Sequence, residues 1–376
     1  MMIDDFKVNI AETEIADLKE CIKKTRWPDE LKNSQWTYGT NLSYLKELAE
    51  YWQSEFDWRK TEEKINAYPN FIAEIDGCKI HFIHVKSERE NAIPILITHG
   101  WPGSFLEMFK VIDCLKNSEE LAFDIIVPSI IGFGFSEKIT THGVDYGFVA
   151  DLWHKLILQL GYKNYSIQGG DIGAGISIRL AQQHPESIIA LHLNYISDSY
   201  QPYLVEGEKL SDEELAYKSF AEKWNATEGA YGMIQSTKPL SLAYGLNDSP
   251  IGLCAWIIEK FNSWSDNDGY IENCFTKDEL LSNVSLYWFT QTIHSSMRMY
   301  HAISQNPMVF GPHDFVKSSV GFANFPKEIP TPPRSYIEKG LNLIQWTNMP
   351  KGGHFAALEQ PELLATDIIS LLEKVI

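Results

Sequence analysis

Asp171 lies in a run of small residues, 169–175, between an apolar stretch and a helix-like segment. This is the outline of a nucleophile elbow, a sharp strand-to-helix turn that exposes one reactive side chain above a sheet. A serine at this position would indicate an esterase or lipase. A carboxylate that attacks a saturated carbon instead forms an ester that water can cleave. The aspartate therefore indicates opening of epoxides or displacement of halides through a covalent ester.

A second motif is placed to stabilise such an intermediate. Residues 99–102, with the sequence His-Gly-Trp-Pro, follow the apolar stretch 93–98 directly. In an α/β hydrolase this loop supplies one backbone N–H group of the oxyanion hole, and the residue after the nucleophile supplies the other. The expected donors are therefore the N–H groups of Trp101 and Ile172.

A base is expected near the end of the chain. His354 follows a pair of glycines after an apolar stretch and precedes the last predicted helix. A histidine that comes after the nucleophile in the chain, in this setting, is typical of α/β hydrolases. A carboxylate should orient this imidazole and stabilise its charged form. Asp314 and Glu328 are the candidates, and their order along the chain favours Glu328.

An epoxide oxygen is a poor leaving group unless an acid protonates it, and a neutral tyrosine suits that task. The predicted helical insertion, residues 198–300, contains five candidates, namely Tyr231, Tyr244, Tyr270, Tyr287 and Tyr300. The glycine-rich loop 132–136 lacks the third glycine of a nucleotide loop, and we interpret it as a rim of the active site.

The surrounding pattern predicts elements that position these residues. Strands are expected at 93–98, 124–127, 165–168, 188–193, 320–325 and 341–346, after a hairpin of 71–75 and 79–85. Helices are expected at 104–115, 148–160, 175–184 and 361–374, and two more precede the sheet at 11–24 and 42–58. Strand–helix alternation of this kind predicts a parallel sheet with helices on both faces.

Composition excludes several classes of partner. The formal charge of −18 argues against nucleic acid or an anionic membrane as the main partner. Five scattered cysteines lack metal spacing and indicate free thiols in a reducing compartment. We find no signal pattern and no apolar run long enough for a membrane span. A soluble, cytoplasmic protein is expected.

The motifs resemble those of the microsomal-type epoxide hydrolases, which include the juvenile-hormone epoxide hydrolases. The resemblance runs nearly end to end and rests on residues 26–28, 56–58, 99–104, 169–171, 234–239, 295–300 and 352–359. It implies an α/β-hydrolase fold with a mostly parallel eight-stranded sheet flanked by helices. The implied divisions are an N-terminal wrapping segment (1–70), a core in two parts (71–197 and 304–376) and a helical lid (198–303).

The resemblance also implies roles for individual residues. Asp171 would be the nucleophile, His354 the base and Glu328 its acid partner, with Tyr231 and Tyr300 as proton donors. Further substrate contacts are expected from His99, Pro102, Phe133 and Trp288. Ile172 departs from the family, which commonly has tryptophan after the nucleophile, so the family resemblance does not define the substrate of this pocket. An apolar epoxide is the implied substrate, no cofactor or metal is implied, and a homodimer is plausible.

Two other functions remain open from the sequence. A haloalkane dehalogenase uses the same aspartate but needs halide-binding N–H donors, and the Trp101 side chain could be one. A non-catalytic binding protein of the same fold would need a broken triad, whereas all three positions are intact here.

Overall fold

The computed structural model describes residues 3–376 and contains a nine-stranded sheet with the order β1-β2-β3-β5-β4-β6-β7-β8-β9. The strands are β1 (Ile3–Asp5), β2 (Asn70–Ile75), β3 (Cys78–Val85), β4 (Ile93–Thr98), β5 (Phe123–Pro128), β6 (Tyr165–Gly169), β7 (Ile188–Leu193), β8 (Val316–Asn324) and β9 (Leu341–Asn348). Strands β1, β2, β3 and β5 pair antiparallel, and all pairs from β5 to β9 are parallel. The fold prediction is confirmed.

The number of strands differs from the eight expected, because β1 adds to the sheet edge beside β2 through the register Ile3↔Ala73. This strand has only three residues and all are exposed, so no alternation of apolar and polar residues marks it. The predicted hairpin joins β2 and β3, and Asp76 and Gly77 both have positive φ, 50° and 79°. Positive φ at both central residues is the signature of a tight hairpin turn.

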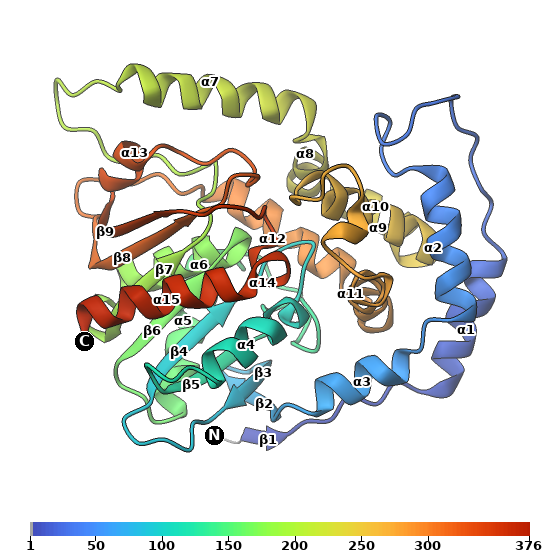
Figure 1. Cartoon of the computed structure of the whole chain (residues 1–376), viewed down its shortest axis with the longest axis horizontal. Helices are drawn as coiled ribbons and strands as arrows, with labels where there is room; N and C mark the ends of the chain where they lie inside the picture. Colours follow the sequence, from blue (N-terminus) through green and yellow to red (C-terminus); the bar gives the residue numbers. More distant parts are fainter. Residues whose placement is uncertain (1–2) are drawn as a thin grey trace.

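Helices cover both faces of the sheet. α4 (Phe109–Lys116) packs with α15 (Pro361–Val375) on one face, and α5 (Tyr146–Gln159) packs with α6 (Asp171–Gln183) on the other (Figure 1). The central strands β4, β6 and β7 are therefore buried almost throughout, which explains their continuous apolar sequences. Short helices complete the core, namely α13 (Arg334–Glu338), α14 (Ala356–Glu359) and the 3₁₀ turns η1 (Phe105–Met108) and η2 (Pro185–Ser187).

The region between β7 and β8 is helical, as the sequence predicts. Its helices are α7 (Asp212–Thr227), α8 (Ala230–Thr237), α9 (Pro239–Asp248), α10 (Pro250–Ser263), α11 (Lys277–Thr290) and α12 (Ile293–Gln305), with the 3₁₀ turn η3 (Ile271–Asn273). Figure 1 shows α8 to α12 as yellow-to-orange ribbons beyond one end of the sheet, while α7 lies next to α13. We refer to α7–α12 as the lid.

The N-terminal segment braces the lid from outside (Figure 1). It contains α1 (Glu12–Lys23), α2 (Leu42–Ser54) and α3 (Trp58–Asn66). The Trp52 indole donates a hydrogen bond to Ser285 of α11 at 2.9 Å, and the Thr61 hydroxyl pairs with Ser282 at 2.7 Å. The single helix predicted for 42–58 is thus two helices, because Asp57 caps the start of α3.

None of the helices within residues 3–376 is both long enough and apolar enough to cross a bilayer.

Candidate active site

Asp171 is the first residue of α6 and lies directly beyond the end of β6. Its φ of 47° is rare for a residue with a side chain, and it turns the carboxylate out of the sheet. A side chain at Gly173 would collide with the Thr98 carbonyl of β4, so this glycine lets α6 approach the sheet. The helix therefore begins four residues before the predicted start at 175, because packing overrides the low helix propensity of its glycines.

The loop after β4 holds one oxygen of the nucleophile. The Trp101 backbone N–H donates to Asp171 Oδ1 at 2.8 Å. A side chain at Gly100 would collide with the same oxygen. Lid helix α11 fixes the loop from above, since Asn283 Nδ2 donates to the Pro102 carbonyl and the Tyr287 hydroxyl donates to the Gly103 carbonyl, both at 2.8 Å.

The second predicted oxyanion donor belongs to α6. The N–H group of Ile172 lies in the first turn of this helix, where N–H groups have no intrahelical partner. It therefore stays a prediction that this group joins Trp101 N–H when charge develops on the Asp171 oxygen.

His354 and Glu328 are aligned with the nucleophile. His354 Nε2 lies 3.3 Å from Asp171 Oδ2, and its Nδ1 lies 2.5 Å from Glu328 Oε1. The side chains of His354 and Glu328 are 3% and 1% exposed, so water screens this pair little. Asp314, the alternative acid, instead accepts the Gly311 N–H at 2.7 Å within its own loop.

Electrostatics favour the protonated form of this imidazole. Burial lowers the pKa of His354, but the charge of Glu328 and the hydrogen bonds to Asp171 and Glu328 outweigh burial and raise it well above the ordinary value. Burial raises the pKa of Glu328, and the charge of His354 opposes that rise. The resting site therefore favours an imidazolium between two carboxylates.

Glu359 holds the histidine loop in place. Its carboxylate accepts the N–H groups of Gly353 and Phe355, each at 3.0 Å, and that of Asp266 at 2.8 Å. Burial raises the pKa of Glu359 to about 7, although these backbone hydrogen bonds lower it. The sequence places Glu359 in a motif but gives no sign of this role, because its partners are backbone groups.

Two half-buried tyrosines share a cavity with Asp171. This cavity of about 380 Å³ lies between the sheet and the lid, and its wall includes Tyr231 and Tyr300. The Trp101 ring stacks on Tyr231 at 5.4 Å and meets Tyr300 edge-on at 5.7 Å. Burial raises the pKa of both phenols well above the ordinary value, so both remain protonated donors at neutral pH. We call this space the substrate cavity.

The other predicted substrate contacts lie elsewhere. His99 accepts the Ile130 N–H at 3.1 Å, and burial lowers its pKa to about 4, so it ties two loops together as a neutral imidazole. Phe133 is fully buried against His99. Within residues 3–376, the wall of the substrate cavity includes none of His99, Pro102, Phe133 and Trp288. It is formed partly by Tyr146, Tyr195, Trp224, Met233 and Ile303.

Comparisons with known proteins identify the family. A model described as the epoxide hydrolase N terminus matches residues 3–108, and one for the alpha/beta hydrolase fold matches residues 93–206. Epoxide hydrolase 1 of Sus scrofa is 41% identical over 99% of this chain and 89% of its own length. The chain belongs to the epoxide hydrolase family. This confirms the resemblance predicted from the motifs.

Other family members agree over most of their length. Juvenile hormone epoxide hydrolase 2 of Ctenocephalides felis is 34% identical over 99% of this chain and 85% of its own. The epoxide hydrolase structure from Aspergillus niger matches all of this chain and 97% of its own, with a TM-score of 0.87 and 33% identity. The juvenile hormone epoxide hydrolase structure from Bombyx mori covers 100% of this chain and 94% of its own, with a TM-score of 0.86 and 31% identity.

Across the described range, 3–376, no three His, Cys, Asp or Glu side chains are grouped so that they could hold a metal ion.

Proposed function

We propose that this epoxide hydrolase converts apolar epoxides to vicinal diols through an ester formed on Asp171. One observation carries the proposal. Oδ1 of Asp171 accepts the Trp101 N–H, and Oδ2 lies beside Nε2 of His354. The same carboxylate faces a cavity whose wall includes two protonated tyrosines. This combination supplies a nucleophile, a base and an acid around one apolar space.

Ring opening uses the oxygen that the Trp101 N–H group leaves free. Oδ2 of Asp171 forms a bond to one epoxide carbon as the ring C–O bond breaks. The departing oxygen takes a proton from Tyr231 or Tyr300, whose hydroxyl groups are buried and protonated. The product of this step is a hydroxyalkyl ester on Asp171.

Ester hydrolysis uses His354. Because the ester carries no charge, His354 first releases its resting proton to solvent, and it recovers one when the Asp171 carboxylate is restored. A water molecule then gives one proton to Nε2 of neutral His354 while its oxygen adds to the carboxyl carbon of Asp171. The oxyanion at Oδ1 is stabilised by Trp101 N–H and Ile172 N–H, and one such donor typically contributes about 3–4 kcal/mol. Collapse expels the diol oxygen, which takes the proton from His354. The remaining proton of the new carboxyl group restores the tyrosine through solvent, so all atoms balance.

The wall of the substrate cavity favours a neutral substrate. Its charged side chains, over the described part of the chain, are Asp171 and Asp198, and it has no Lys or Arg. A carboxylate on the substrate would meet like charge there, although water partly screens the repulsion from the exposed Asp198. We therefore infer an apolar, uncharged epoxide.

The decisive experiment measures diol formation from styrene oxide and from a long-chain alkyl epoxide in the wild type and in Asp171→Ala. Diol that disappears in the variant supports the proposal. In His354→Gln the first step should survive and the second should fail, so mass spectrometry should find the substrate covalently attached to Asp171. A protein that is folded and forms neither diol nor ester contradicts it.

One observation supports the alternative function, that of a haloalkane dehalogenase. The Trp101 indole N–H is buried without a hydrogen-bond partner in the described structure, as a halide-binding donor would be. Halide release from a haloalkane, with no diol from any epoxide, would favour that function instead.

A further inference from the structure

Helix α12 contributes to the walls of two different cavities. Tyr300 lines the substrate cavity, whereas His294, Arg298 and Ala302 line a cavity of about 540 Å³ between α12 and the loop 131–145. These three residues recur every four positions, a spacing that places side chains on one face of a helix. Helix α12 therefore forms a partition between the substrate cavity and this second space, which we call the α12 cavity.

Arg298 brings an uncompensated positive charge to the α12 cavity. The side chain is half-buried, and within residues 3–376 it forms no ion pair and no hydrogen bond. Burial lowers the pKa of Arg298, and no neighbouring carboxylate opposes that effect. Buried arginines are usually paired, and this chain has 50 acidic residues that could supply a partner. The guanidinium thus keeps its hydrogen-bond donors free.

The acid in the wall of this cavity is already occupied. Asp145 Oδ1 accepts the Phe148 N–H at 3.0 Å and caps α5, while Oδ2 accepts Asn306 Nδ2 at 2.8 Å. No other Asp or Glu among the described residues lines the α12 cavity. Asp145 therefore holds the loop and helix together and does not neutralise Arg298.

His294 supplies a further donor beside the guanidinium. It lies one turn before Arg298 on the same face of α12, and burial and the charge of Arg298 both lower its pKa. A neutral imidazole carries one N–H group. An arginine binds a carboxylate through two parallel hydrogen bonds, so Arg298 and His294 together offer three donors to one such group.

The rest of the wall is largely apolar. It includes Ile131, Ile139, Val144, Met299 and Ala302. The volume of the cavity falls within the roughly 300–1,000 Å³ that is typical of small-molecule sites. An inorganic anion would leave these side chains against water, whereas an alkyl chain would cover them. The cavity therefore suits a molecule that is anionic at one end and apolar along the rest.

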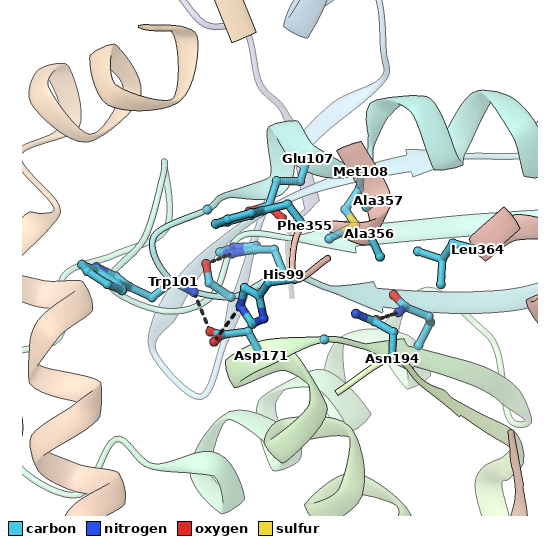
Figure 2. Close-up of a pocket in the computed structure, with 15 residues that line it drawn as sticks. His99, Trp101, Glu107, Met108, Asp171, Asn194, Phe355, Ala356, Ala357 and Leu364 are labelled. Atoms are coloured by element: carbon cyan, nitrogen blue, oxygen red, sulfur yellow. Dashed lines mark hydrogen bonds and ion pairs between the residues drawn. The ribbon is translucent and has the colours of Figure 1, made fainter. Parts of the chain in front are cut away.

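The catalytic side of α12 offers no competing cation. Over the described residues, neither the substrate cavity nor the smaller cavity behind the nucleophile has a Lys or Arg in its wall. Figure 2 shows Asp171 and Glu107 among the residues that line the smaller cavity. These carboxylates disfavour an anion there, so the two sides of α12 differ in the charge that they accept.

We propose that the α12 cavity is a second ligand site, which binds an amphipathic carboxylate with its anionic end on Arg298 and its alkyl chain along the apolar wall. The inference is independent of the proposed function, because it concerns a different cavity and requires no epoxide chemistry.

Isothermal titration calorimetry with octanoate tests the proposal. Octanamide has the same chain without the charge, and acetate has the charge without the chain, so both should bind at least about tenfold more weakly. Arg298→Gln should weaken octanoate at least about tenfold and leave octanamide unchanged, because the charge-assisted bidentate contact is lost. Arg298→Lys keeps the charge without the planar fork, and its affinity should lie between the two.

Two control variants locate the site. Arg334→Gln removes an exposed arginine that already pairs with Glu338, and it should bind octanoate as the wild type does. Asp171→Ala changes the substrate cavity and should also leave octanoate unaffected. A marked change of affinity in Asp171→Ala would place octanoate on the catalytic side and overturn the inference.

A fourth variant tests the apolar wall. Ala302→Phe fills the α12 cavity while keeping Arg298, so it should weaken octanoate and octanamide alike; thermal unfolding confirms that each variant is folded. Wild-type affinity for octanoate in Arg298→Gln or in Ala302→Phe contradicts the proposal, as does a wild type that binds octanoate no more tightly than octanamide. Absence of diol formation would overturn the proposed function but would not change these binding results.

Discussion

The ammonium group of Lys260 lies 4.7 Å from the centre of the Tyr231 ring. The lysine belongs to α10, is only 5% exposed, and pairs with the neighbouring Glu259 at 2.5 Å. A cation over a phenol ring interacts more strongly once the phenol has given up its proton and become negative. Lys260 is therefore placed to stabilise charge that develops only during ring opening, which is the kind of interaction that accelerates a reaction.

We expect Lys260→Met to slow ester formation by about fivefold to thirtyfold, the equivalent of a desolvated cation–π interaction of roughly 1–2 kcal/mol. Ester breakdown should be unchanged, because Tyr231 has already acted. Lys260→Arg keeps the cation and should recover most of the rate. Single-turnover fluorescence measures the first step. Lys223→Met, an exposed lysine of the lid, is the control, and a loss confined to ester breakdown would contradict this role.

His354 should change its protonation when the nucleophile is alkylated. Burial lowers its pKa, whereas Glu328 and Asp171 raise it, and the net pKa lies well above the ordinary value. Ester formation removes the charge of Asp171, so the pKa of His354 must fall and the neutral base becomes available when hydrolysis needs it. Asp171→Asn mimics this loss of charge. We expect His354 to deprotonate at lower pH in this variant than in the wild type.

An NMR titration of the histidine side chains measures this shift, with His354→Gln to assign the signal. Asp314→Asn removes a carboxylate in a separate loop and should leave the pKa of His354 unchanged. An equal or higher pKa in Asp171→Asn would show that the charge of the nucleophile does not control the base.

The elements that position the site were largely predictable. Each has a local sequence signal, and the motifs follow one another along the chain in the order found in α/β hydrolases. The strand β4 was predicted with its observed bounds, Ile93–Thr98, since a strand buried on both faces is continuously apolar. The elbow and the histidine loop are both marked by glycines. Those of the elbow allow close packing of α6 on the sheet, and Gly352 adopts a φ of 109° in the histidine loop. Glu328 was favoured by chain order, and the structure brings it to His354.

What the sequence does not reveal is contact between distant segments. Lys260 meets Tyr231 only because α10 and α8 lie together within the lid, and Glu107 lines a groove beside α11 only because the lid packs on the core. Phe133 and Trp288 were predicted to contact the substrate, but the wall of the substrate cavity, over the described residues, includes neither. Aromatic residues near an active loop are as apt to support it as to line the pocket, and only packing decides between these roles. The start of α6 was missed because its glycines serve close packing, which propensity alone does not register.

Gly100 should be essential for a steric reason. A methyl group at this position collides with Asp171 Oδ1, the oxygen that accepts the Trp101 N–H. Gly100→Ala should therefore displace the nucleophile and lower kcat at least about a hundredfold, as expected for a misplacement near 1 Å. Gly245→Ala is the matched control, because it lies in helix α9 with open space around it. Near-normal turnover in folded Gly100→Ala, checked by thermal unfolding, would contradict the predicted geometry.

Asp198 should select against anionic substrates. It lines the substrate cavity, where Asn225 Nδ2 donates to its carboxylate at 2.8 Å. A matched pair, 4-oxiranylbenzoate and its methyl ester, differs mainly in one remote charge. Asp198→Asn should raise kcat/KM for the anion about threefold to tenfold and leave that for the ester unchanged, since one partly screened repulsion is removed. The gain should shrink as salt is added. Asp212→Asn, at the start of α7, should change neither substrate. Equal gains for both substrates would show that Asp198 shapes the cavity rather than its charge selectivity.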